Sequence, residues 1–159
     1  MGLDMYLSKK HYVQNWDHDP KNWEVTVTLN GEPYPDVDSK RVTYVTEQVM
    51  YWRKANAIHA WFVRNVQGGI DECQVAHVSR EQLEELLKDV EAALVNGKKG
   101  AEQVLPTESG FFFGGTEYDE WYWDSLKETR KMLLAESKSW GEGYQHPLSY
   151  PDYEYQSSW

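Results

Sequence analysis

The sequence predicts an α+β fold, in which a small antiparallel sheet built from N-terminal hairpins packs against about three helices. Residues in the first third alternate between apolar and polar types, and an Asn30-Gly31 pair marks a hairpin turn. The later part of the chain carries helical periodicity instead. With 159 residues, the chain is long enough for one domain with a buried core.

Most of the predicted strands lie before residue 46. Residues 3–7 alternate as a short strand, and residues 23–29 have the β-branched, period-two pattern of a second strand that ends at the hairpin turn. Residues 40–45 are interpreted as the returning strand. Residues 73–78 alternate again and predict one more strand.

Three helices are predicted in the remainder. The first begins between residues 46 and 52 and ends before Gly68 and Gly69. The second follows a capping box formed by Ser79 and Gln82 and ends near residues 96–97. The third begins after Thr116 and runs to about residue 137. Residues 1–140 are therefore expected to form a single α+β domain, followed by a Tyr- and Pro-rich tail at residues 141–159.

The composition narrows the class of protein. The formal net charge is -10, which disfavours a non-specific nucleic-acid binder. Cys73 is the sole cysteine, so a reducing compartment such as the cytoplasm fits. No run of eighteen apolar residues is present, so we expect no membrane span. The sequence contains no fingerprint for a bound cofactor.

The stretch YWRKANAIHAWFVRN, residues 51–65, is the centre of the one basic region in this acidic chain. Residues 40–66 carry five positive charges and one negative charge. On a helical wheel, Tyr51, Ala55, Ile58, Phe62 and Val66 form an apolar stripe that is expected to face the core.

A polar flank lies beside this stripe on the wheel and contains Trp52, Asn56 and His59. One interpretation is a pocket, in which an aromatic face stacks a base and the amide and imidazole bind its edge. The other interpretation is a boundary His and Asn that bond to neighbouring backbone. The residues proposed to bind a ligand are Trp52, Arg53, Lys54, Asn56, His59, Trp61, Tyr118 and Tyr122.

The segment GFFFGGTEYDEWYW, residues 110–123, places glycines before a helix. No Lys follows Gly114 and Gly115, so it is not a P-loop. We expect a tight turn that inserts phenylalanines into the core, with Tyr118 and Tyr122 as pocket walls. The acidic face of the following helix is interpreted as solvated surface, so no metal site is predicted. No nucleophile and base pair is visible, so no catalytic residue is assigned.

Three segments resemble a family of small proteins that are widespread in bacteriophages and prophages: MGLDMYL, YWRKANAIHAWFV and LPTESGFFFGGTEYDEWYW. The resemblance extends to about residue 136. Members are often labelled phosphoglycerate kinase, but this chain is far too short for that two-domain enzyme. No activity or catalytic residue follows from the resemblance. It implies a phage accessory protein that acts in the cytoplasm of the bacterial host.

These observations favour a non-enzymatic protein that sequesters a nucleotide-like anionic ligand, in counter-defence or host modulation. One alternative is an acidic inhibitor of a host protein, with a charge distribution like that of DNA. A second alternative is a small hydrolase or nuclease that uses His59 as its acid or base. A homo-oligomer is compatible with all three.

Overall fold

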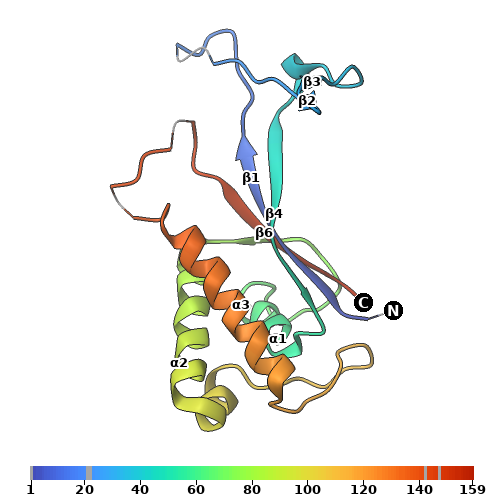
Figure 1. Cartoon of the computed structure of the whole chain (residues 1–159), viewed down its shortest axis with the longest axis vertical. Helices are drawn as coiled ribbons and strands as arrows, with labels where there is room; N and C mark the ends of the chain where they lie inside the picture. The colour runs from blue at the N-terminus through green and yellow to red at the C-terminus, as the bar shows by residue number, and fades with distance from the viewer. Residues whose placement is uncertain (1, 21–22, 142, 147) are drawn as a thin grey trace.

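The computed structural model describes residues 2–20, 23–141, 143–146 and 148–159. In these residues the chain has an α+β fold with three α-helices, a four-stranded antiparallel sheet and a two-stranded hairpin (Figure 1). In chain order the elements are β1 (Asp4–Tyr12), β2 (Thr28–Leu29), β3 (Glu32–Pro33), the 3-10 helix η1 (Ser39–Arg41), β4 (Tyr44–Arg53), α1 (Asn56–Asn65), β5 (Ala76–Val78), α2 (Arg80–Val104), α3 (Glu120–Ser137) and β6 (Asp152–Ser158).

The sheet has one buried face. Its strand order is β4-β1-β6-β5, and every pair of neighbours is antiparallel. Met5 and Leu7 of β1 and Tyr153 and Tyr155 of β6 are buried, while the residues between them are not. This alternation follows from the two-residue period of a strand. Apolar residues of α1, α2 and α3 complete the core on that face.

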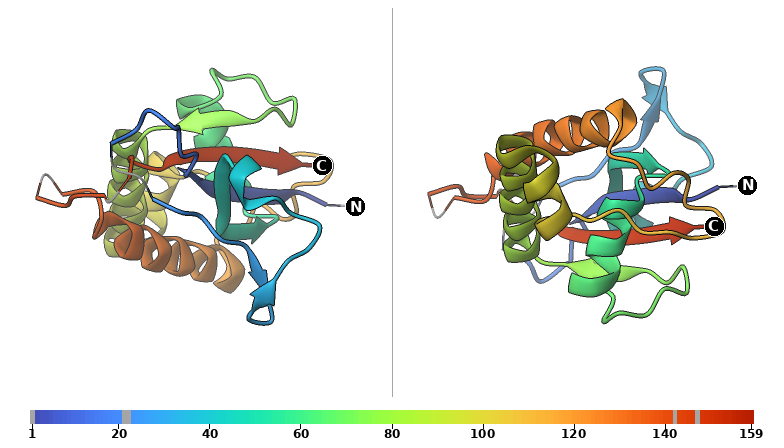
Figure 2. Two further views of the ribbon diagram at one scale, coloured as in Figure 1. Left: turned by 90° about the horizontal axis from the view of Figure 1, so that it is seen from above. Right: turned by 90° about the horizontal axis from the view of Figure 1, so that it is seen from below.

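The C-terminal segment differs from the predicted tail. Residues 152–158 form β6, which pairs with β1 on one side and with β5 on the other. Figure 2 shows β6 running through the middle of the sheet. Tyr153, Tyr155 and Ser157 are buried. The boundary at residue 140 therefore does not separate this strand from the domain, because its tyrosines are part of the core.

The predicted start of the first helix is wrong. Residues 44–53 form β4, which pairs with β1 along its whole length, and α1 begins only at Asn56. Trp52 is buried on the sheet, whereas Tyr51 is 43% exposed instead of facing the core. On a helical wheel Ala57 and Ala60 lie opposite the apolar stripe, yet both are buried, because α1 is short and is enclosed over most of its surface.

The other two helices begin with side-chain caps. At α2 the predicted capping box between Ser79 and Gln82 is confirmed, and the helix continues past a kink at Gly97 to Val104. At α3 the N-cap is Asp119, not Thr116, and its carboxylate accepts the N–H of Tyr122. In Figure 1, α2 and α3 run side by side.

Two loop predictions have different outcomes. The hairpin turn is confirmed, since Asn30 and Gly31 join β2 to β3 with positive φ angles, although only the end of residues 23–29 forms a strand. The phenylalanine turn is inserted only in part, because Phe111 is 94% exposed whereas Phe113 is partly buried and packs against the core. No helix in the described part of the chain is long and apolar enough to cross a membrane.

Candidate functional site

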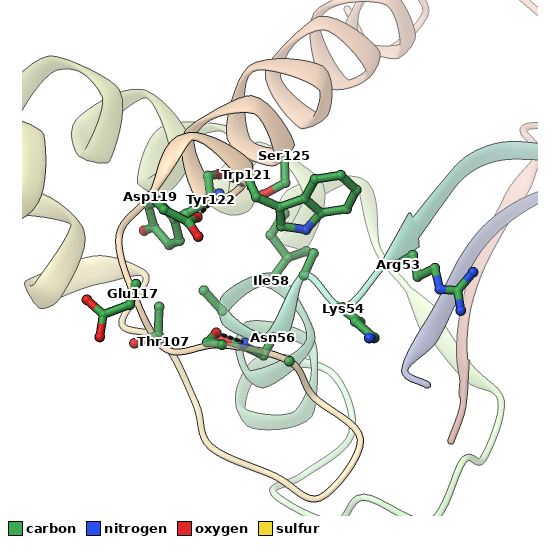
Figure 3. A pocket seen from close by; sticks show the side chains of 14 residues that line it. Arg53, Lys54, Asn56, Ile58, Thr107, Glu117, Asp119, Trp121, Tyr122 and Ser125 are labelled. Carbon is green, nitrogen blue, oxygen red and sulfur yellow. Dashed lines mark hydrogen bonds between the residues drawn. The ribbon is translucent and has the colours of Figure 1, made fainter. Parts of the chain in front are cut away.

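A cavity of about 370 Å³ lies where the end of β4, the start of α1 and the start of α3 meet (Figure 3). The loop between α2 and α3 closes its remaining side. Four of the eight residues predicted to bind a ligand line this cavity: Arg53, Lys54, Asn56 and Tyr122. The structure therefore brings together half of the predicted site, and it does so at the junction of a strand with a helix.

Lys54 supplies positive charge at the rim. Its φ of 55° lies in the left-handed region, which costs a non-glycine residue about 1 kcal/mol. Its stem packs against Gly114, where an added Cβ would lie 3.2 Å from the Lys54 Cβ. Figure 3 shows Arg53 extending away from the cavity. Among the described residues, neither cation takes part in a hydrogen bond or ion pair through its side chain.

The first turn of α1 forms the floor of the cavity. Its N-cap is Ala55, and no side-chain hydrogen bond caps the helix. Residues 55–58 line the cavity, so the positive end of the helix dipole lies beside it. Helix N-termini of this kind are ready sites for anions, because their first N–H groups have no acceptor within the helix.

The opposite side of the cavity combines an aromatic ring with carboxylates. Trp121 is 61% exposed, and its indole lies at the mouth of the cavity (Figure 3). Glu117 and Asp119 lie across the cavity from Lys54. Asp119 also accepts the N–H of Tyr122 at 3.0 Å, so part of its charge is used within α3. The cavity is thus positive at one end and negative at the other.

Asn56 fixes the loop that closes the cavity. Its amide nitrogen donates to the carbonyls of Phe113 and Gly115 at 3.0 and 2.8 Å. Its oxygen accepts the N–H of Glu108 at 2.9 Å. Its side chain is therefore occupied by the protein, and it positions the loop at three points instead of facing a ligand.

Tyr122 is a wall of the cavity whose hydroxyl is also occupied. The hydroxyl donates to the carbonyl of Leu105 at 2.8 Å. Burial raises its pKa above the ordinary value of 10.0, and the neighbouring Tyr118 acts in the same direction. Tyr122 therefore stays neutral at physiological pH and offers a ligand its ring rather than a charge.

Three aromatic residues of the predicted site do not line this cavity. Trp52 donates to the Thr129 hydroxyl at 2.8 Å, and Trp61 donates to the Asp89 carboxylate at 2.8 Å. The Tyr118 hydroxyl accepts the N–H of Thr107 at 3.3 Å. Trp52 and Trp61 are buried. These residues hold elements together, since their polar atoms bind side chains or backbone far away in the sequence.

His59 is at the centre of a buried polar chain. It is fully buried, with Nδ1 2.7 Å from the Tyr155 hydroxyl and Nε2 2.8 Å from Asp71 Oδ2. The other Asp71 oxygen accepts the Trp159 indole N–H at 3.1 Å. Burial raises the pKa of Tyr155 well above 10.0. The imidazole thus joins α1 to β6 and has no free nitrogen for a substrate.

Trp121, like Glu117 and Asp119, lines the cavity and was missed by the sequence prediction. A helical wheel over residues 120–137 contains the signal, because Tyr122, Leu126, Thr129 and Leu133 are the buried positions of α3. Trp121 lies off this face, next to polar positions, which is unusual for so large an apolar side chain.

In the described part of the chain, no three His, Cys, Asp or Glu residues gather in a way that could hold a metal ion.

Comparisons with protein-family models, with curated proteins and with solved structures find no match to this chain. The geometry of the cavity and the chemistry of its residues therefore carry the functional argument.

Proposed function

We propose that the protein is a non-enzymatic binder that sequesters a nucleotide-like anionic ligand in the cavity beside Lys54. The observation that carries this proposal is the cavity itself, which combines the uncapped start of α1, the ammonium of Lys54, which bonds to none of the described residues, and the exposed ring of Trp121. Its volume of about 370 Å³ lies in the range of small-molecule sites.

The polarity of the cavity suggests one orientation for the ligand. A phosphate would lie between Lys54 and the first N–H groups of α1, where charge and donors coincide. A base would stack on Trp121. Its amino groups would then face Glu117 and Asp119, which accept hydrogen bonds but repel a phosphate. A mononucleotide has this separation of an anionic end from a hydrogen-donating ring.

Binding without turnover is favoured by what lines the cavity. Among the described residues, the lining contains neither a His nor a Cys. The hydroxyl of Ser125 donates to the Tyr122 carbonyl, and that of Thr107 donates to the Thr116 carbonyl. Among the described residues of the lining, none is thus placed as a nucleophile beside a general base. Because His59 is enclosed, a hydrolase built on His59 is not proposed.

The setting in which we expect this binding is the cytoplasm of a bacterial host, with the protein acting as a phage accessory protein. The support for this setting is the resemblance of the YWRKANAIHAWFV and GFFFGGTEYDEWYW segments to small phage proteins. Sequestration of a signalling nucleotide would then blunt a host response.

Thermal unfolding in the presence of AMP, GMP, CMP, UMP, their cyclic forms or inorganic phosphate tests this proposal. At a ligand concentration of about 100 times Kd, binding should stabilise the protein by about 2.7 kcal/mol. This corresponds to a rise in Tm of about 5–10 °C for a domain of this size. The proposal fails if none of these compounds raises the Tm.

The variant Lys54→Ala distinguishes binding in this cavity from non-specific attraction to positive charge. The substitution removes one charge-assisted contact, which should weaken nucleotide binding about 10- to 100-fold in calorimetric titrations. Lys99→Ala removes the same charge from an exposed position on α2 and should bind as the wild type does. Equal losses in both variants would assign the binding to net charge instead of to the cavity.

A further inference from the structure

We infer that the groove between the free edge of β4 and α3 binds an extended peptide, which adds to the sheet as a fifth strand. This groove is a second cavity, of about 270 Å³, that lies beside the nucleotide cavity and on the other side of Trp121. Its walls are formed by Met50, Tyr51, Trp52 and Arg53 on β4 and by residues of α3. The inference goes beyond the proposed function and does not depend on it.

Within the described sheet β4 pairs on one side only, so part of its backbone faces this groove. The N–H of Lys54 donates to the Leu3 carbonyl at 2.7 Å, and Arg53 and Tyr51 lie opposite Asp4 and Tyr6. In an antiparallel pair, residues alternate between bonding to the neighbour and pointing away from it. Lys54 and Trp52 therefore bond to β1, whereas the N–H and C=O groups of Tyr51 and Arg53 point outward.

Strand β4 is an edge of the sheet that is open to pairing from Met50 to Trp52. Its only neighbour in the described sheet is β1. Residues 50–52 contain no charged residue and no proline, and the register shift in the pairing with β1 lies before them, between Gln48 and Met50; charges, prolines and bulges are the usual means of blocking an edge. Peptides add to exposed edges of this kind by main-chain hydrogen bonds, and a helix beside the edge supplies pockets for their side chains.

The side chains of the groove select the chemistry of the peptide. Trp52 is buried at the base, and Trp121 stands exposed at the rim, so a large apolar side chain fits between the two rings. On the α3 wall, Asp124 and Glu128 lie one helical turn apart and face the same groove. Asp124 pairs with Lys127 at 3.1 Å but remains mostly exposed.

These features define one occupant: an extended peptide with an apolar residue and, two positions along, a Lys or Arg. Residues two apart in a strand point to the same face, so both side chains would face α3. The apolar one would fill the space beside Trp121, and the cation would meet Glu128 and Asp124. The net charge of -10 attracts basic segments over a longer range.

The test uses the full-length protein and the acetylated, amidated peptide TLTKTLT, labelled with fluorescein. Its even positions carry Leu, Lys and Leu on one face. The peptide should bind measurably in fluorescence anisotropy, and TLTETLT, in which Glu replaces Lys, should bind at least tenfold more weakly. The inference is overturned if neither peptide binds or if both bind equally.

Strand addition has a signature that simple groove binding lacks. Two versions of TLTKTLT are N-methylated, one at the even and one at the odd amides, so that only one version loses the donors that face β4. One version should lose binding and the other should retain it. Hydrogen exchange at the Tyr51 and Arg53 amides should slow on peptide binding, while exchange at Trp52 should be unchanged. Equal binding of both versions would exclude strand addition.

Charge reversal on the protein completes the test. Glu128→Lys should weaken TLTKTLT about fivefold or more, since it replaces an attraction with a repulsion. Glu84→Lys makes the same change in net charge at an exposed position of α2 and should leave the affinity unchanged. The Tyr51 and Arg53 amides should exchange freely in the protein without peptide. If they are already protected, and more so at higher protein concentration, a second copy of the protein occupies the edge and the inference of a peptide partner is wrong.

Discussion

Two ends of one short segment, residues 54–61, use polar groups in opposite ways. At its start, Lys54 and the first turn of α1 present charge and N–H groups to a cavity without a bonded partner among the described residues. At its end, His59 and Trp61 are buried, and their ring nitrogens are bonded to Tyr155, Asp71 and Asp89. Groups that face the cavity and groups that are bonded inside the protein are thus only a few residues apart.

The difference shows that residue type alone does not mark a site. His59 and Trp61 are residue types common in binding sites, yet here their polar atoms are used to fasten α1 to β6 and α2. Lys54 is an ordinary surface residue type, yet its unusual backbone conformation holds it beside an uncapped helix. A polar group is available to a ligand when the fold leaves it unpaired.

The largest expected effect is at the buried end. His59→Ala removes two buried hydrogen bonds and leaves a cavity, so the free energy of unfolding should fall by about 4 kcal/mol. Urea unfolding measures this change. His77→Ala changes an exposed His and should alter stability by about 0.5 kcal/mol or less. A small effect at His59 would show that its bonds to Tyr155 and Asp71 contribute little.

An intermediate effect is expected at Asn56, which lies between the two ends. Asn56→Ala removes three hydrogen bonds to the loop and should cost about 2–3 kcal/mol. The amide of Glu108 should then exchange faster with solvent, and nucleotide binding should weaken because the loop no longer closes the cavity. Asn96→Ala, at an exposed position of α2 where, among the described residues, the amide bonds only to the Ala92 carbonyl, is the control. Unchanged exchange at Glu108 would contradict the role given to Asn56.

A smaller, pH-dependent effect is expected at Tyr122. Burial raises its folded-state pKa above the unfolded value of 10.0, so its contribution to stability is complete below pH 10 and is lost as the pH rises further. Between pH 10 and 11 this contribution should fall by about 1 kcal/mol, because the unfolded tyrosine is only half ionised at pH 10. Tyr122→Phe should remove that part of the slope in urea midpoints, while the two proteins run parallel below pH 9. Equal slopes above pH 10 would contradict this assignment.

The sequence predicted the structure correctly where the structure depends on neighbouring residues. The Asn30-Gly31 turn and the capping box of Ser79 and Gln82 form as predicted, because each depends on residues only a few positions apart. The sequence also predicted Arg53, Lys54, Asn56 and Tyr122 as site residues, and these line the cavity. Trp121 was missed because its place beside β4 depends on how α3 packs.

By itself, the sequence determined the α+β class, the turn, the start of α2 and the basic segment. Only the tertiary structure decided that residues 46–53 form a strand, that β6 lies inside the sheet and that His59 is enclosed. The physical reason is that these outcomes rest on partners far away in the chain: β4 pairs with β1, and His59 bonds to Tyr155, which is 96 residues away. Local secondary-structure propensity cannot predict such contacts, since they form only when the core is assembled.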